Sequence, residues 1–297
     1  MSTRLAAPGP AVATSAHRAS PGQMARYRFR KNRLALAGAV LLVAVLVCVA
    51  LLPLVLGTDP NGIDLRSVRQ PPSGAHLLGT DATGRDVFAR LLAGGRVSLG
   101  IGVTAAAGAL LLGIALGVAA GMVGDRVDSV IMRAADITLS FPSLIVVIVV
   151  VGILGPSVAT LIVAIALFEW PTTCRLVRGE LLALREQEFV QAARVVGVSD
   201  ARLVLRHYIP ALLMPLSVVA TLLIAHTILL EAALSFLGLG VQPPQASWGN
   251  MLNDAQSLTA LESMPWLWVP PGVAIILTVL SVNFIGDGLR DALDTRG

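Results

Sequence analysis

The sequence predicts an all-α, polytopic membrane protein with six transmembrane helices, and three observations lead to this class. Hydrophobic residues make up 55% of the 297 residues, charged residues make up 13%, and the mean hydropathy is +0.79. Soluble domains of this length do not have such a composition. The apolar residues also gather in six long runs between charged loops. Each run reaches the roughly 20 residues that a helix needs to cross the hydrocarbon core of a bilayer.

The six runs define the expected membrane-spanning elements in chain order. Five of them contain no Asp, Glu, Lys or Arg, and the fourth contains only Glu169. Cys48 and Cys174 fall in the first run and at the end of the fourth, and two such isolated cysteines predict neither a disulfide framework nor a metal site. The runs cover residues 34–58, 97–124, 137–155, 156–174, 208–230 and 263–286.

The distribution of Lys and Arg predicts that both termini lie in the cytoplasm. Residues 1–33 contain seven basic and no acidic residues, and with six crossings the cytoplasmic segments hold 17 basic residues against five outside. Cytoplasmic loops carry this excess in membrane proteins. The expected order is a cytoplasmic tail (1–33, disordered to about residue 25), a first helix (34–58), an extracytoplasmic loop (59–96), a transmembrane domain (97–290) with a cytoplasmic loop (175–207), and a cytoplasmic tail (291–297).

The second run is rich in glycine. Gly113, Gly117 and Gly121 repeat at four-residue spacing, which lines small residues along one helix face and lets another backbone approach closely. We expect this face to pack against another helix of the same chain. A subunit interface or the lining of a solute path is the alternative.

Few ionisable residues fall within the runs. Secondary transporters and pumps place carboxylates or histidines in the membrane to bind ions or relay protons. The candidates here are His226, Glu169 and Glu231, and we interpret His226 as a hydrogen-bonded packing residue. The chain therefore shows no obvious device for coupling transport to an ion gradient.

Signatures of ATP hydrolysis and of enzyme active sites are missing as well. The only lysine, Lys31, lies in RKNR and not in a phosphate-binding glycine loop. We therefore expect no cofactor in this chain, and any ATP would be hydrolysed by a partner. Asp287, Asp291 and Asp294 share a helix face but alternate with arginines, which favours a solvated turn over a metal site. The net charge of +4 follows topology, so no nucleic-acid partner is expected.

The cytoplasmic loop carries the most specific local pattern. Gly197 is suited to a left-handed helix C-cap, and Ser199 to the N-cap of a second helix that runs through residue 209. A narrow apolar stripe with small central residues predicts a helix that fits the groove of a partner. A helix lying on the lipid surface is the alternative. The stripe comprises Phe189, Ala192, Ala193 and Val196, and its polar flank comprises Glu186, Glu188, Gln191 and Arg194.

The same loop resembles the cytoplasmic EAA motif of ABC-importer permeases. Gln191-Ala192-Ala193, Gly197 and Pro210 fall at the motif's spacing, although Gln191 replaces a glutamate and His207 replaces an isoleucine. From about residue 25 onward the chain is similar to the second permease subunit of the dipeptide, oligopeptide and nickel importers. The similar segments are HLLGTDATGRDVFARLLAGGRVSL (76–99), ADITLSFPSL (135–144), EAALSFLGLGVQPPQASWGNML (231–252) and GDGLRDALD (286–294).

The resemblance implies a type I ABC-importer permease in a bacterial cytoplasmic (inner) membrane, with peptides as the expected substrate. It implies a homologous second permease, two ATP-binding subunits that hold ATP and Mg²⁺, and an extracytoplasmic solute-binding protein. Membrane lipid is the remaining expected partner. The residues expected to couple this chain to an ATP-binding subunit are Glu188, Phe189, Gln191, Ala192, Ala193, Val196 and Gly197.

Two segments expected outside the membrane have candidate roles, and two other functions are alternatives to the importer. Asp81, Arg85, Asp86 and Arg90 are candidates for contact with the binding protein, or for salt bridges within their own turn and helix. Residues 231–262, with Trp248, are a candidate re-entrant element. A stand-alone secondary transporter or channel is the alternative function, a membrane-embedded enzyme is a more distant one, and within the importer class nickel or another small solute could replace peptides.

Overall fold

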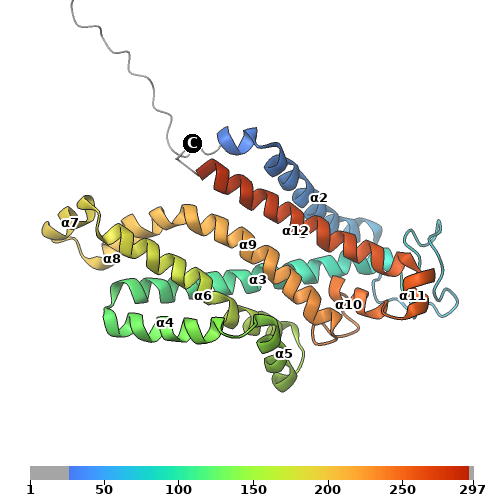
Figure 1. The fold of residues 1–297 in the computed structure, drawn as a ribbon. Helices are drawn as coiled ribbons and strands as arrows, with labels where there is room; N and C mark the ends of the chain where they lie inside the picture. Colours follow the sequence, from blue (N-terminus) through green and yellow to red (C-terminus); the bar gives the residue numbers. More distant parts are fainter. Residues whose placement is uncertain (1–26, 294–297) are drawn as a thin grey trace, which may run out of the picture.

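The computed structural model describes residues 27–293 as an elongated bundle of helices (Figure 1). Within this range the only β pairing is one isolated bridge, between Thr80 and Asp86, so the all-α prediction is confirmed. The elements are α2 (Arg33–Leu56), α3 (Val87–Met122), α4 (Asp125–Leu139), α5 (Ser143–Leu154), α6 (Val158–Arg185), α7 (Glu188–Val195), α8 (Asp200–Leu203), the π-helical turn η1 (Val204–Tyr208), α9 (Ile209–Phe236), α10 (Trp248–Asp254), α11 (Leu258–Ser263) and α12 (Pro265–Leu293).

Five described helices are long and apolar enough to cross a membrane: α2, α3, α6, α12 and the continuous helix formed by η1 and α9. The count becomes six if the bent pair α4–α5 forms one broken span. The bundle has two distinct ends (Figure 1): α7 and α8 lie at one end, and α10, α11 and the loop that follows α2 lie at the other. The predicted disorder up to about residue 25 lies outside the described residues.

The parallel helices α3 and α6 approach each other closely along the predicted glycine face. A Cβ atom on Gly113 would lie 2.5 Å from Thr173 Cβ, and one on Gly117 would lie 2.7 Å from Val177 Cβ. Real Cβ atoms do not come this close to their neighbours, so larger residues would push the helices apart. Gly121 continues the face against Leu181. The expected packing within the chain is therefore confirmed.

Helix α2 packs antiparallel against α12 and is joined to α3 by Arg96. Pro53 lies inside α2 and has no N–H to donate to the carbonyl of Val49, four residues earlier. Arg96 Nε donates to this Val49 carbonyl at 2.8 Å, and Arg96 Nη2 donates to the Ala50 carbonyl at 2.6 Å. An arginine from a neighbouring helix thus satisfies the backbone that proline leaves unpaired.

Several long helices extend beyond the apolar runs from which they were predicted, and the extensions contain charged residues. Helix α3 begins at Val87, ten residues before the expected run, because the Asp86 side chain accepts a hydrogen bond from Ala89 N at 2.8 Å and caps the helix there. The loop expected over 59–96 is correspondingly shorter. Helix α6 continues to Arg185, whose Nη1 donates to the Gly121 carbonyl at 2.8 Å. Similarly, α12 continues to Leu293, into the expected tail.

The third run does not form one spanning helix, which corrects the expectation for residues 137–155. Residues 125–136, expected as a loop, belong to α4, and α5 follows after a break of three residues at an angle of 89° to it. Pro142 explains the break, because proline cannot donate a backbone hydrogen bond and disfavours helical geometry at Phe141. Ion pairs of Asp128 with Arg178 and of Asp136 with Arg175 hold α4 against α6.

Candidate functional site

The short helix α7 and its flanking turns form the candidate site at one end of the bundle (Figure 1). Two residues join α7 to α6, and Val196 to Ser199 lead from α7 to α8. Because α8 runs through η1 into α9, α7 is the connection between two membrane-length helices. The ends of α6 and α9 are therefore joined in the chain through α7.

Gly197 turns the chain after α7 in the way that the sequence predicts. Its φ angle is +82°, in the left-handed region, and Val198 N donates to the Ala193 carbonyl at 3.0 Å. This six-to-one hydrogen bond is that of a Schellman motif, in which glycine occupies the left-handed position. A Cβ atom on Gly197 would meet no other atom within 4 Å. The requirement for glycine is thus conformational and not steric.

One face of α7 anchors the helix and the other is free in this chain. Val190 is fully buried in a hydrophobic cluster with Leu181, Leu203 and Tyr208, and Ala193 packs against the same cluster. On the opposite side Phe189, Ala192 and Val196 are exposed, with exposed fractions of 49% for Phe189 and 83% for Val196. An exposed apolar surface of this kind is typical of a protein contact site.

The polar residues of the site are also accessible. Glu188 lies in the first turn of α7, where a negative charge interacts favourably with the helix dipole. Gln191 is exposed, and its Nε2 donates to the Glu186 carbonyl at 3.3 Å. The ring of Phe189 lies 6.1 Å from that of His207, centroid to centroid. All seven predicted coupling residues therefore lie together on one short element and its C-terminal turn.

Two features of this segment differ from the sequence analysis. The second helix begins after Ser199 as expected, but it continues through η1 into α9 and does not end at residue 209. The π-helical turn makes this possible, since Ile209 N bonds to the Val204 carbonyl just before Pro210. The predicted apolar stripe also differs: Ala193, expected on the stripe, packs against the buried cluster, and the anchor is Val190, which the predicted stripe did not include. Its spacing of three residues from Ala193 was the available signal.

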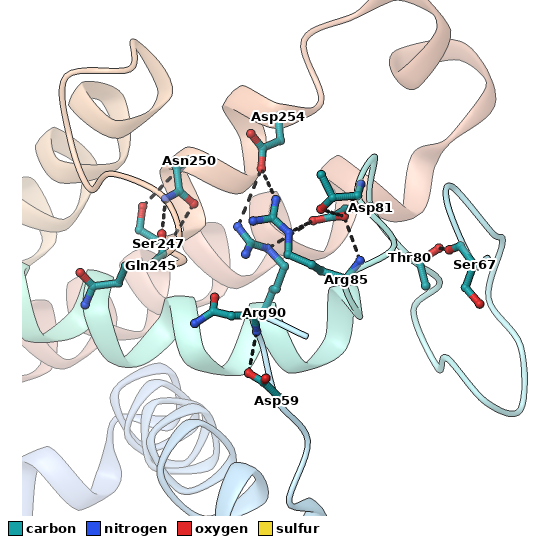
Figure 2. A network of polar contacts seen from close by, with 12 residues as sticks. Asp59, Ser67, Thr80, Asp81, Arg85, Arg90, Gln245, Ser247, Asn250 and Asp254 are labelled. Atoms are coloured by element: carbon teal, nitrogen blue, oxygen red, sulfur yellow. Dashed lines mark hydrogen bonds and ion pairs between the residues drawn. The ribbon is translucent and has the colours of Figure 1, made fainter. Parts of the chain in front are cut away.

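A buried charge cluster occupies the opposite end of the bundle (Figure 2). Asp81 Oδ2 accepts from Arg85 Nε at 2.6 Å and lies 3.6 Å from Arg90 Nε. Asp254 of α10 lies 3.6 Å from Arg85 Nη2 and 3.8 Å from Arg90 Nη2. Arg90 is only 2% exposed. The cluster therefore ties the start of α3 to the preceding loop and to α10.

The two carboxylates of this cluster have opposite pKa shifts. Burial raises the pKa of Asp81, but hydrogen bonds from the Thr83 backbone and hydroxyl and from Arg85 outweigh this effect and lower its pKa below the ordinary value. Burial raises the pKa of Asp254, against the opposing effect of Arg90 and Arg85. Asp81 is thus the carboxylate that the fold stabilises in its charged form.

The structure assigns internal roles to the four residues proposed for binding-protein contact. Asp81, Arg85 and Arg90 form the charge cluster, while Asp86 caps α3 and its Oδ2 lies 2.8 Å from His76 Nδ1. The alternative of salt bridges within their own turn and helix describes what the structure contains. Contact of these four residues with a binding protein stays a prediction.

Several of the other polar residues that the sequence singles out have partners within the chain. His226 Nε2 lies 3.2 Å from Glu169 Oε1, so the expected hydrogen bond is present, but the His226 side chain is 52% exposed and is not packed in the core. Glu231 is fully buried, and its Oε1 accepts from Ser235 Oγ at 2.7 Å. Asp291 Oδ2 accepts from Asn32 Nδ2 at 3.1 Å, whereas Asp294 lies outside the described residues.

Trp248, the residue singled out in the outer segment 231–262, is buried at the start of α10. Its backbone N–H donates to Ser98 Oγ at 3.1 Å, and its Nε1 donates to the Leu91 carbonyl at 3.0 Å. Gly95 of α3 leaves room for the indole, since a Cβ there would lie 2.8 Å from Trp248 Cζ2. The segment therefore packs as a cap against the start of α3.

Comparison with known proteins gives matches over almost the whole chain. Residues 113–296 match the model of the binding-protein-dependent transport system inner membrane component, and residues 20–72 match the N-terminal TM domain of oligopeptide transport permease C. The chain is 48% identical over 280 residues to a "Putative peptide permease protein" of Brucella suis, covering 94% of this chain and 93% of the relative. It is 42% identical over 277 residues to the dipeptide transport system permease protein DppC of Alkalihalophilus pseudofirmus, covering 93% and 90%.

The charge cluster makes a prediction about stability. Replacing Asp81 with Asn leaves Arg90 buried beside a neutral group, and we expect this change to cost about 3 kcal/mol of unfolding free energy. The matched change Asp254→Asn is expected to cost about 1 kcal/mol or less, because the Asp254 side chain is 45% exposed and its contacts are longer. Thermal unfolding of the purified variants in detergent measures the difference. Equal midpoints for both variants would contradict the ranking.

Proposed function

Because the chain belongs to the family of binding-protein-dependent transport system inner membrane components, we propose that it is the permease subunit of an ATP-driven importer of di- and oligopeptides. The family match covers more than half of the chain. Two relatives that align over more than nine-tenths of its length carry peptide or dipeptide permease names. The match of residues 20–72 to an oligopeptide permease segment supports the same substrate class.

The exposed face of α7 is the observation in this structure that favours an ATP-driven importer. Its apolar stripe lies outside the membrane-length helices, is anchored from behind by Val190, and joins α6 to α9. We infer that an ATP-binding subunit holds this face in a groove. Closure of two such subunits on ATP would then move α7 and, through it, the ends of both helices. The stand-alone transporter is not favoured, since it gives this face no role.

The complete transporter has partners of four kinds in this proposal. A homologous second permease completes the membrane pathway, and two ATP-binding subunits bind ATP and Mg²⁺, so that this chain itself hydrolyses nothing. An extracytoplasmic binding protein delivers the peptide. Membrane lipid surrounds the bundle, and no nucleic acid takes part. The general requirement for ATP-binding and partner subunits follows from the family.

The orientation in the bacterial cytoplasmic membrane is part of the proposal. The excess of Lys and Arg supports a cytoplasmic position for both termini and for α7. The loop after α2, α10 and α11 would then face outward, where a binding protein can reach them. The arrangement in Figure 1 supports this assignment, because α7 and the α10–α11 region lie at opposite ends of the bundle.

The substrate assignment predicts a growth phenotype. Deleting this chain should abolish growth on short peptides that supply a required amino acid, with growth on the free amino acid unchanged. Normal peptide uptake together with failed nickel uptake would contradict the peptide assignment and leave the family assignment unchanged.

The proposed division of labour predicts where ATP is hydrolysed. The purified chain alone should hydrolyse no ATP, and peptide-stimulated hydrolysis should appear only in the complete transporter.

The orientation predicts which sites react from outside the cell. Single cysteines at the exposed positions Ser73 and Ser257, in a chain without Cys48 and Cys174, should react with an impermeant maleimide in intact cells. A cysteine at Ser199, beside α7, should react only after the cells are permeabilised. Labelling of Ser199 but not Ser257 in intact cells would reverse the orientation.

The turn after α7 predicts a coupling defect. Gly197→Val puts a β-branched residue at positive φ, at a cost of about 1–3 kcal/mol. The transporter should assemble and keep basal ATPase activity but lose transport and its stimulation by the loaded binding protein. The matched control is Gly179→Val, because Gly179 lies in α6 without left-handed geometry and without a neighbour near its Cβ position. Equal transport by both variants would show that the Gly197 turn is not needed for coupling.

The docking face makes a separate prediction. Ala192→Trp places an indole on the exposed stripe, in a position that fits a methyl group, and should abolish co-purification of the ATP-binding subunits. Ala82→Trp adds an exposed indole at the opposite end of the bundle and should leave co-purification unchanged. Normal co-purification with Ala192→Trp would instead support α7 as a helix on the lipid surface.

A further inference from the structure

An open cavity on the side of the bundle contains an ionisable residue, Glu169, for which the coupling segment gives no role. It has a volume of about 270 Å³ and lies between α6 and α9. Glu169, Thr172 and Thr173 line it from successive turns of one face of α6. His226 lines it from α9, together with the apolar residues Leu222 and Val219, which lie one and two turns away along that helix.

The position of Glu169 makes this cavity unusual for a surface in contact with lipid. Glu169 lies eleven residues after the start of α6, about 17 Å along the helix axis, and within the apolar run 156–174 of a membrane-length helix. Its side chain is 14% exposed, and that of His226 is 52% exposed. Carboxylates at this depth face protein or a water-filled path because lipid cannot solvate them. The open side of the cavity therefore faces either the second permease or the solute path.

The polar groups of the cavity are a carboxylate, two hydroxyls and an imidazole, and the carboxylate and hydroxyls can accept hydrogen bonds. Glu169 Oε1 bonds to His226 Nε2, and Ser143 of α5 also lies within reach of the carboxylate. Thr173 is fully buried, and its Oγ1 has no hydrogen-bond partner within the described chain. The carboxylate and the hydroxyls of Thr172 and Thr173 offer several acceptors from one helix face, and a primary ammonium has three donors to match them.

We propose that the Glu169–Thr173 face of α6 binds the terminal ammonium group of a peptide as the peptide passes through the membrane. This inference rests on the proposed function as a peptide importer. His226 acts as a positioning residue that holds the carboxylate toward the cavity, while the leucine and valine side chains of α9 accommodate the uncharged part of the peptide. A charge-assisted hydrogen bond to Glu169 supplies the preference for a free amino terminus.

The test measures direct binding to the complete transporter, trapped with ATP and vanadate and without its binding protein. The probes are radiolabelled trialanine and N-acetyl-trialanine, which differ only in the ammonium group. Wild type should bind trialanine about tenfold more tightly than its acetylated form. Glu169→Gln should weaken trialanine binding about tenfold and leave binding of the acetylated peptide unchanged. The matched control Glu180→Gln, on an exposed residue three turns further along α6, should retain the wild-type preference.

Three results would overturn the site. These are the absence of saturable trialanine binding by wild type, equal affinity of wild type for both peptides, and equal weakening of both by Glu169→Gln. If the two permeases separate in gel filtration of the Glu169→Gln transporter, the Glu169–His226 pair belongs to the interface between the permeases instead. Uptake of trialanine by wild type in the presence of its binding protein tests the proposed function separately, so failure of the site and failure of the function are distinguishable.

Discussion

The close contact between α3 and α6 is the constraint on which the rest of the structure depends. Gly113, Gly117 and Gly121 let α6 pack against α3 at a distance that side chains would prevent. The same contact fixes the position of Trp170 and Cys174, against which α4 packs through Ala135. The position of α6, which carries Glu169 and leads into α7, therefore depends on three residues without side chains.

Arginine side chains that bridge neighbouring helices are the second feature that holds the bundle together. Arg96 satisfies carbonyls of α2 beside Pro53, Arg90 joins the outer charge cluster, and Arg178 binds α4 through Asp128. Each guanidinium has several donors in a fixed geometry, so it can link backbone or carboxylate groups of two elements at once. These arginines join α2 to α3, α3 to α10, and α4 to α6.

The coupling segment and the polar cavity lie on the same two helices. Helix α6 carries Glu169 and ends at α7, and α9 carries His226 and begins beyond it. A movement of α7 by an ATP-binding subunit would shift both walls of the cavity relative to each other. The proposed ammonium site and the proposed docking face are thus two ends of one mechanical connection, and ATP binding would change the affinity of the site as well as its access.

The sequence by itself determined the membrane class, the glycine face, the turn at Gly197 and, except for the inward-facing Ala193, the exposed stripe of α7. Each depends on local composition, spacing or backbone conformation, which a single chain segment already specifies. Only the tertiary structure decided where α3 and α6 end, how Pro142 divides α4 from α5, and which partners Arg90, Arg96 and Glu169 have. Those outcomes depend on groups that are distant in sequence. Asp254 lies 164 residues from Arg90, and their pairing becomes visible only when α10 packs beside α3.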